Sequence, residues 1–152
     1  VQGYDTNLKV NLPLRTRADV DVLRAGIVDG TIDCVATHHQ PHEWDSKTCE
    51  FEYAKPGMIG LETCYGVLGS IGFDQETILR VLCDGPRKVF GLQSNALAVG
   101  AEADLTIFLP EYEYSFNASQ IRSKSRNTPF IDKLLKGKVV GIVSKDELYL
   151  NK

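Results

Sequence analysis

The chain has 152 residues, of which 43% are hydrophobic and 24% charged, and its net charge is −3. This composition is typical of a globular protein with one domain or two small ones. The 17 basic and 20 acidic residues give no electrostatic reason to expect a nucleic-acid partner. No apolar run approaches the ~18–20 residues of a membrane span, and no secretion signal opens the sequence. We therefore expect a cytoplasmic protein that binds neither nucleic acid nor a membrane.

A helix followed by a strand is predicted early in the chain. Thr16 and Asp19 have the spacing of a helix-capping box, with Asp in place of the more usual Glu. An apolar pattern of helical period follows and stops at Gly30. The short β-branched segment 31–37 then predicts a buried strand. A helix, a glycine and an apolar strand in this order are typical of a βα repeat.

Three short helices are predicted after a long loop over residues 43–60. The first helix covers residues 61–71 and is weakened by two glycines. The second begins after the capping residue Asp74, and the third is a short turn that begins at Pro86. Loops as long as the one before these helices are often functional.

The second part of the sequence changes from helical to β-like patterns. Strands are predicted at residues 104–109, 138–143 and 147–150. We therefore divide the chain into a helix-rich α/β segment over residues 1–92 and a β-rich segment over residues 93–152.

The four cysteines are far apart in the sequence and include no C-x-x-C pair. This spacing is typical neither of a zinc ribbon nor of a compact disulfide framework. We expect buried, reduced thiols at Cys34, Cys49, Cys64 and Cys83.

All three histidines lie within five positions, at the C-terminal end of the predicted strand. Imidazole is a common metal ligand and a common acid–base near neutral pH. In a β/α barrel, strand ends of this kind face the mouth of the active site. Because side chains alternate along a strand, His38 and His39 cannot readily face the same ion, so a metal would need ligands from elsewhere. From this pattern alone, a functional and an incidental cluster are about equally supported.

Two residues near the cluster are expected to have structural roles. His39 lies on the opposite side of the predicted strand from its neighbours and is expected to pack or to support the site. Glu62 follows a glycine-rich turn, and we interpret it as a first-turn helix carboxylate rather than a catalytic acid.

Successive segments of the chain resemble blocks of the dihydroorotase family, in the family's order and over nearly the whole length. As a set these blocks are specific, although each one alone is weak. The asparagine that opens the first block favours dihydroorotase over the related hydantoinases and allantoinases. The matching blocks are residues 11–15, 29–33, 36–42, 56–63, 100–105, 124–130 and 135–139.

The resemblance implies a fold and an activity. The fold is α/β: residues 1–92 would be the C-terminal part of a TIM-type β/α barrel, and residues 93–152 part of the amidohydrolase β-sandwich domain. The activity is the zinc-dependent, reversible cyclisation of N-carbamoyl-L-aspartate to dihydroorotate in pyrimidine biosynthesis. In this family the zinc activates a hydroxide and polarises the amide carbonyl.

The resemblance also assigns roles to individual residues. Asn11 and His42 would contact the substrate, and Pro56 and Gly57 would offer backbone contacts to its ring. An amide, an imidazole and main-chain N–H groups are suitable donors for a dianionic substrate.

The sequence departs from the family at the catalytic position. His38 stands where the family has an aspartate that binds metal and shuttles the proton. An imidazole can bind zinc, so His38 remains a candidate metal ligand and catalytic residue, but a metal-bound imidazole is a poor base. The family's other metal ligands come from earlier barrel strands, which this chain does not contain. We therefore expect the chain to be a fragment that is inactive alone.

Three interpretations of function stay open. The parent protein is an active dihydroorotase, or it is a non-catalytic homologue that acts as a scaffold for aspartate transcarbamoylase. In the third interpretation the 152-residue chain itself is a free-standing binding module derived from half of an amidohydrolase. In the first two cases the missing strands would come from the remainder of the same chain or from another subunit, because the strands of an opened barrel leave unpaired edges.

Overall fold

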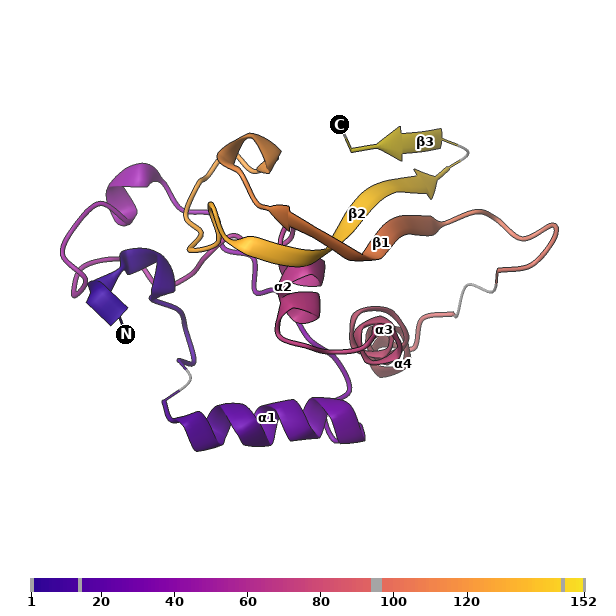
Figure 1. Ribbon diagram of the computed structural model, residues 1–152, viewed down its shortest axis with the longest axis horizontal. Helices are drawn as coiled ribbons and strands as arrows, with labels where there is room; N and C mark the ends of the chain where they lie inside the picture. Colours follow the sequence, from indigo (N-terminus) through magenta and orange to yellow (C-terminus); the bar gives the residue numbers. More distant parts are fainter. Residues whose placement is uncertain (1, 14, 94–96, 146, 152) are drawn as a thin grey trace. The chain divides into compact units, whose positions relative to one another are not determined.

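The computed structural model describes residues 2–13, 15–93, 97–145 and 147–151 (Figure 1). The chain forms two compact units, each assembled from segments that are separated in the sequence. Unit 1 contains Val1–Gly26, Ala36–Cys64 and Ser115–Leu134. Unit 2 contains Ile27–Val35, Tyr65–Tyr114 and Leu135–Lys152. These units describe how segments of the chain pack together. The domain boundary that we place after residue 92 stays a prediction.

The first predicted helix and its capping box are confirmed. Helix α1 (Arg17–Asp29) begins directly after Thr16. The Thr16 backbone N–H donates to the Asp19 carboxylate at 2.8 Å, and the Asp19 N–H donates to the Thr16 hydroxyl at 3.2 Å. Asp therefore fulfils the reciprocal role of the usual Glu. The hydrogen bonds from Thr16 lower the pKa of the Asp19 carboxyl.

In unit 2, helix α2 (Cys64–Ser70) packs closely on strand β2 (Leu134–Ser144). The two glycines that were predicted to weaken this helix permit the close approach. A Cβ added to Gly69 would lie 2.3 Å from the Lys136 carbonyl oxygen, and one added to Gly66 would lie 3.2 Å from the Leu135 Cβ. The Ser70 hydroxyl accepts a hydrogen bond from the Lys136 N–H at 2.8 Å, which fixes the contact.

The second and third predicted helices form one continuous helical stretch. Helix α3 (Gln75–Leu79) continues through a π-helical turn, η4 (Arg80–Asp84), into helix α4 (Gly85–Phe90), and Figure 1 shows α3 and α4 end-on. Pro86 has no N–H to offer, and a locally widened turn is one way for a helix to continue past it. The stretch ends at Gly91, which takes the left-handed conformation.

The three predicted strands are confirmed and form one sheet in the order β1–β2–β3. Strand β1 (Leu105–Ser115) and β2 are longer than predicted, whereas β3 (Glu147–Leu150) has the predicted bounds. β2 and β3 pair antiparallel, with Gly141 opposite Leu150 and Ser144 opposite Glu147.

The predicted buried strand over residues 31–37 is wrong. These residues form no strand, and none of them is buried. A strand exists only where a neighbouring backbone continues the hydrogen-bonded ladder, and local composition does not supply that neighbour. Instead, the Val35 N–H donates to the Val81 carbonyl of the helical stretch at 3.0 Å.

Unit 1 consists mainly of loops around a small core. Four short 3₁₀ helices interrupt its described loops, and Ile59, Phe116 and Ile121 are among its buried apolar side chains. The short helices are η1 (Gln2–Tyr4), η2 (Thr6–Leu8), η3 (Trp44–Ser46) and η5 (Ala118–Gln120). With so little regular structure, many backbone groups of this unit must find other hydrogen-bond partners.

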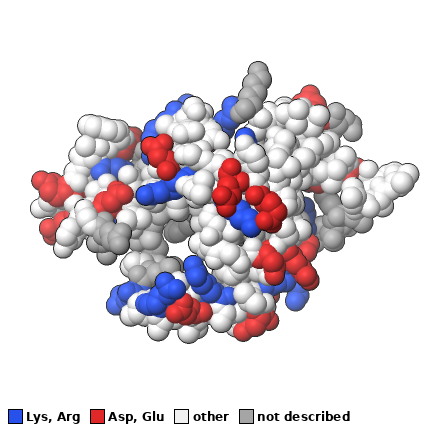
Figure 2. Space-filling view, in the orientation of Figure 1, with Lys and Arg blue, Asp and Glu red and all other residues white. Residues whose placement is uncertain are grey.

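Several large apolar side chains lie exposed in both units. Helix α1 has no buried residue, and its Val22 and Val28 are 71% and 63% exposed. All four residues of β3 are exposed. On the face shown in Figure 2, acidic and basic side chains gather in small groups of both signs. Among the described residues, no helix combines the length and apolar character that crossing a bilayer requires.

The cap of α3 yields a test of stability against pH. Asp74 accepts a hydrogen bond from the Thr77 N–H at 2.7 Å, and this bond lowers the pKa of the Asp74 carboxyl. The stabilisation is therefore complete above the ordinary carboxyl range and is lost as the pH falls through the lowered pKa. Replacing Asp74 by Ala should lower the melting temperature of the full-length protein by about 2–4 °C at pH 7.

The matched variant is Asp74→Asn, whose amide oxygen caps equally well but does not titrate. It should melt like the wild type at pH 7 and lose less stability between pH 5 and 3, as followed by circular dichroism. Equal melting temperatures for the Ala and Asn variants would contradict this role of the cap.

Candidate functional site

The histidine segment lies beside the Pro-Gly segment in unit 1. His39 and Met58 form a parallel β-bridge, and the Gln40 N–H donates to the Met58 carbonyl at 2.9 Å. This pairing of residues near 40 with residues near 58 closes the long loop between them. It places the end of the segment, at His42, next to Pro56 and Gly57.

Three of the residues predicted to contact a substrate are brought together. The His42 Nε2 lies 3.0 Å from the Pro56 carbonyl oxygen. Gly57 has a φ of 130°, which side-chain-bearing residues rarely adopt. A Cβ at Gly57 would also lie 2.9 Å from the His42 Nε2 and 2.3 Å from the Gln40 Oε1. Both conformation and space therefore require glycine at this position.

The backbone of the Pro-Gly segment is already hydrogen-bonded within the chain. The Gly57 N–H donates to the Lys9 carbonyl at 2.8 Å, and the Gly57 carbonyl accepts from the Lys47 Nζ at 3.0 Å. The Pro56 carbonyl faces the His42 ring. These contacts fix the orientation of both peptide groups, and they occupy backbone atoms that the sequence resemblance assigned to a substrate ring.

Asn127 connects the two segments, and the sequence pattern did not identify it. Its side chain is 4% exposed. Its Oδ1 accepts from the His42 N–H at 3.2 Å, and its Nδ2 donates to the Gln40 carbonyl at 2.9 Å and the Gly57 carbonyl at 3.3 Å. Only the position of Asn127 inside a family-like block marked it in the sequence.

Lys47 is a second residue that the sequence did not identify. It is 8% exposed, and its ammonium group donates to the Lys55 carbonyl at 2.8 Å as well as to Gly57. Burial lowers the pKa of Lys47, because the interior solvates the charged form less well than water does. Two carbonyl oxygens replace part of the lost hydration.

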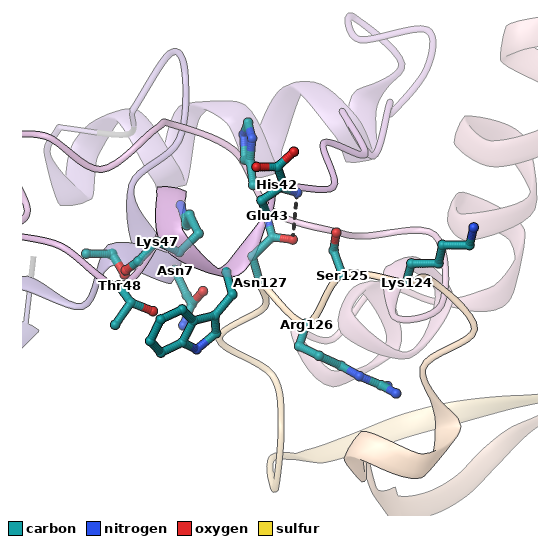
Figure 3. A pocket seen from close by; sticks show the side chains of 11 residues that line it. Asn7, His42, Glu43, Lys47, Thr48, Lys124, Ser125, Arg126 and Asn127 are labelled. Carbon is teal, nitrogen blue, oxygen red and sulfur yellow. Dashed lines mark hydrogen bonds between the residues drawn. The ribbon is translucent and has the colours of Figure 1, made fainter.

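A pocket opens beside these residues in unit 1 (Figure 3). His42, Lys47 and Asn127 contribute to its wall. The side chains of Lys124 and Arg126 extend away from the others in this view, and Arg126 donates to the Ala118 carbonyl at 2.6 Å. The remaining lining residues are Thr6, Asn7, Glu43, Trp44, Thr48 and Ser125. The pocket is therefore bounded by three separate segments of the chain.

The other two predicted site residues are exposed. His38 takes a φ of 46°, in the left-handed region, and its Nε2 lies 3.0 Å from the Gln40 Nε2. Asn11 lies in a bend and does not line the pocket beside His42. The described residues thus assemble His42, Pro56 and Gly57, and they leave His38 and Asn11 outside this cluster.

The chain's own residues do not fit a zinc site. Within the part of the chain that the structure describes, no three side chains of His, Cys, Asp or Glu are grouped to hold a metal ion. The ring nitrogen of His38 is engaged with Gln40. A zinc ion at His38 would therefore need its remaining ligands from residues outside this part of the chain.

The cysteines are reduced, as predicted, but they are not buried. All four are free thiols; Cys83 is exposed, and the other three are half-buried. Burial raises the pKa of the Cys64 thiol. A raised pKa leaves a thiol protonated at neutral pH, so Cys64 is a poor nucleophile.

The two residues expected to be structural have clear contacts. The His39 Nδ1 accepts from the Gly60 N–H at 3.1 Å and the Leu61 N–H at 3.3 Å, so this ring supports the turn before α2. Glu62 does not belong to the helix, which begins at Cys64, so its predicted first-turn role is wrong. Its carboxylate instead accepts from the Ser123 N–H at 2.9 Å.

Comparison with known proteins gives close sequence relatives. The chain is 40% identical over 152 residues to a dihydroorotase of Geobacter sp. (strain M21), with 97% of this chain covered. It is 41% identical over 148 residues to a dihydroorotase of Caldicellulosiruptor saccharolyticus. The resemblance to the dihydroorotase family is confirmed. The chain covers 36% and 34% of these two proteins, so it spans about a third of their length.

No family model matches the sequence. Comparison of structures gives neighbours among the hydantoinases. A D-hydantoinase (dihydropyrimidinase) from Thermus sp. superposes with a TM-score of 0.79 at 20% identity, over 96% of this chain and 34% of that one. An L-hydantoinase (dihydropyrimidinase) from Arthrobacter aurescens gives 0.78 at 25% identity, over 97% and 37%. The mixed helix–strand fold is therefore that of the corresponding parts of these amidohydrolases.

The buried lysine yields a prediction about stability. Lys47→Met keeps an unbranched side chain but removes the side-chain donor to the Lys55 carbonyl and leaves the buried Gly57 carbonyl with Asn127 as its side-chain donor. We expect the free energy of unfolding to fall by about 1–3 kcal/mol at pH 7. Burial lowers the pKa of Lys47 in the folded state. At a pH between this lowered pKa and the ordinary lysine pKa, folding therefore releases a proton from Lys47. Wild-type stability should therefore rise relative to the variant as the pH approaches the ordinary lysine range.

Denaturant unfolding of the full-length protein between pH 7 and 10.5 measures both effects. Lys133→Met, which removes an exposed ammonium group from the same unit, is the control and should change stability little. A difference between wild type and Lys47→Met that narrows as the pH rises would contradict the proposed cause of the pKa shift.

Proposed function

We propose that this chain is the substrate-binding part of a dihydroorotase-like protein, which interconverts N-carbamoyl-L-aspartate and dihydroorotate in pyrimidine biosynthesis. The observation that carries the proposal is the contact of the His42 ring with Pro56 and Gly57. The backbone groups of Pro56 and Gly57 are bonded within the chain and hold this ring, to which the family resemblance gives a substrate contact. The 40% identity to dihydroorotases over nearly the whole chain supports the substrate class.

The His42 contact suggests how an anionic substrate would be bound. A carbonyl oxygen only accepts hydrogen bonds, so the ring nitrogen facing Pro56, Nε2, carries the hydrogen. Nδ1 can then donate to a substrate carboxylate only when the ring also carries its second proton. Asn11 would add an uncharged amide donor from a separate segment. The protonated ring would supply one positive charge and the amide a neutral donor, and both suit the carboxylates of an anionic substrate.

The proposed architecture follows from the same comparisons. Residues 1–92 would form the C-terminal part of a TIM-type β/α barrel, and residues 93–152 part of the flanking β-sandwich. The exposed apolar side chains of α1 and β3 support this proposal, because such surfaces are normally covered. The remainder of a longer chain, or another subunit, would cover them and would supply the missing zinc ligands.

A second candidate function rests on position 38. The family aspartate is replaced by His38, an exposed residue that contacts Gln40. A protein that has lost its proton shuttle could keep the fold and act as a non-catalytic scaffold for aspartate transcarbamoylase. Substrate binding alone does not separate the two candidates, since both keep the His42 cluster.

Turnover of dihydroorotate by the full-length protein at saturating zinc tests the proposal. We expect measurable turnover, and we expect His38→Asp to raise kcat at least about tenfold, because a positioned acid–base typically contributes ~10²–10⁴. His38→Asn is the matched control: it has the size of Asp, and it cannot take a proton at the working pH.

The outcomes separate the candidates. No turnover by the wild type in the presence of zinc and substrate would overturn the enzymatic proposal and favour the scaffold. Activity restored by Asp but not by Asn would then locate the lost chemistry at residue 38. Co-elution of the silent protein with aspartate transcarbamoylase would support the scaffold function directly.

A further inference from the structure

Asn127 has every hydrogen-bonding group of its carboxamide engaged inside the protein. The oxygen accepts from the His42 N–H, and the nitrogen donates to the carbonyls of Gln40 and Gly57. The side chain is 4% exposed, so it has no free polar atom to offer to a ligand. Its role must therefore be exerted through the groups that it contacts.

These contacts join segments that lie far apart in the sequence. His42 and Gln40 are 85 and 87 positions from Asn127, and Gly57 is 70 positions away. The backbone of Asn127 adds a further link, since the Ile59 N–H donates to its carbonyl at 3.0 Å. One residue thus fixes both the segment that carries His42 and the segment that carries Pro56 and Gly57. Figure 3 shows the bond between His42 and Asn127.

The chemistry of the site restricts which residue can stand at position 127. The position requires one acceptor and two donors in a plane, on a side chain short enough to fit between two backbones. Asp supplies the acceptor but no N–H, and Ala supplies neither. The Gly57 carbonyl also accepts from Lys47, so the Gly57 peptide is held from two sides.

We infer that Asn127 is a positioning residue for substrate binding, which sets the distance between the His42 ring and the Gly57 peptide. The inference rests on the proposed function, because it assigns substrate contact to His42. Asn127 itself touches no substrate. Loss of its carboxamide should therefore weaken binding more than it slows the chemical step, since binding groups are displaced while the reacting atoms are supplied elsewhere.

The test uses the full-length protein and two readouts. Hydrogen exchange with peptide resolution reports the local effect: Asn127→Ala should speed exchange in peptides covering residues 40–44 and 56–60 at least about tenfold, and leave peptides covering residues 75–90 unchanged. Steady-state kinetics report the functional effect: KM should rise at least about tenfold, with kcat changed less than about threefold.

Two further variants sharpen the comparison. Asn127→Asp keeps the acceptor for the His42 N–H but turns a carboxylate oxygen toward the Gln40 and Gly57 carbonyls, so it should raise KM at least as much as the Ala variant does. It also carries the test if the Ala variant does not fold. Asn117→Ala removes an exposed asparagine of the same unit and should match the wild type in both readouts.

Three results would overturn the positioning role of Asn127. Unchanged exchange around His42 and Gly57 in folded variants would overturn the inference, and so would faster exchange throughout the protein, which indicates a general stability role. Failure of both Asn127 variants to fold would overturn it for the same reason. If the wild type shows no turnover, the proposed function fails, while the exchange readout still decides whether Asn127 positions these segments.

Discussion

The structure of the candidate site depends on the need to satisfy buried backbone carbonyls in a loop without a strand ladder. Between His42 and Gly57 the loop contains the short helix η3 but no strand. Its carbonyls therefore need other donors, because an unpaired buried carbonyl costs about 1–3 kcal/mol. Lys47 and Asn127 donate to the buried carbonyl of Gly57. Nearer the surface, Lys9 donates to the carbonyls of Phe51 and Glu52. Side chains thus donate hydrogen bonds to carbonyls that would be bonded by neighbouring backbone groups in a helix or a sheet.

This arrangement explains why the site combines a loop with a well-defined geometry. A loop held only at its ends would leave the Gly57 peptide free to rotate. Here the Gly57 N–H and carbonyl are both bonded, and the Pro56 carbonyl faces His42. Under the proposed function, these contacts would hold the His42 ring in place before the ligand arrives, which reduces the entropy that binding must overcome. This arrangement requires Lys47 to be buried. The lowered pKa of Lys47 shows that the transfer of its charge from water is unfavourable.

Local signals in the sequence predicted two helix caps and the three strands of the sheet, whereas contacts between distant residues could not be predicted. Thr16 with Asp19, and Asp74, act through neighbours three positions away, so the pattern contains the whole interaction. The strand over residues 31–37 failed because a ladder partner is not a local property. Asn127 and Lys47 were missed for the same reason: the partners of Asn127 lie 70 to 87 positions away, and nothing near Lys47 marks it as buried.

The contacts that hold His42 and Gly57 are separate from the contact made by His38. Asn127 and Lys47 hold the His42 and Gly57 segments through bonds that do not involve residue 38. His38 is exposed, bonds to the Gln40 side chain, and has no grouped metal ligands among the described residues. Under the proposed function, substrate binding at His42 and proton transfer at residue 38 would therefore be separable. A protein could lose the second through a single substitution at position 38 while every contact that supports the first remains in place, so the conservation of the binding cluster in a homologue says little about whether that homologue still turns its substrate over.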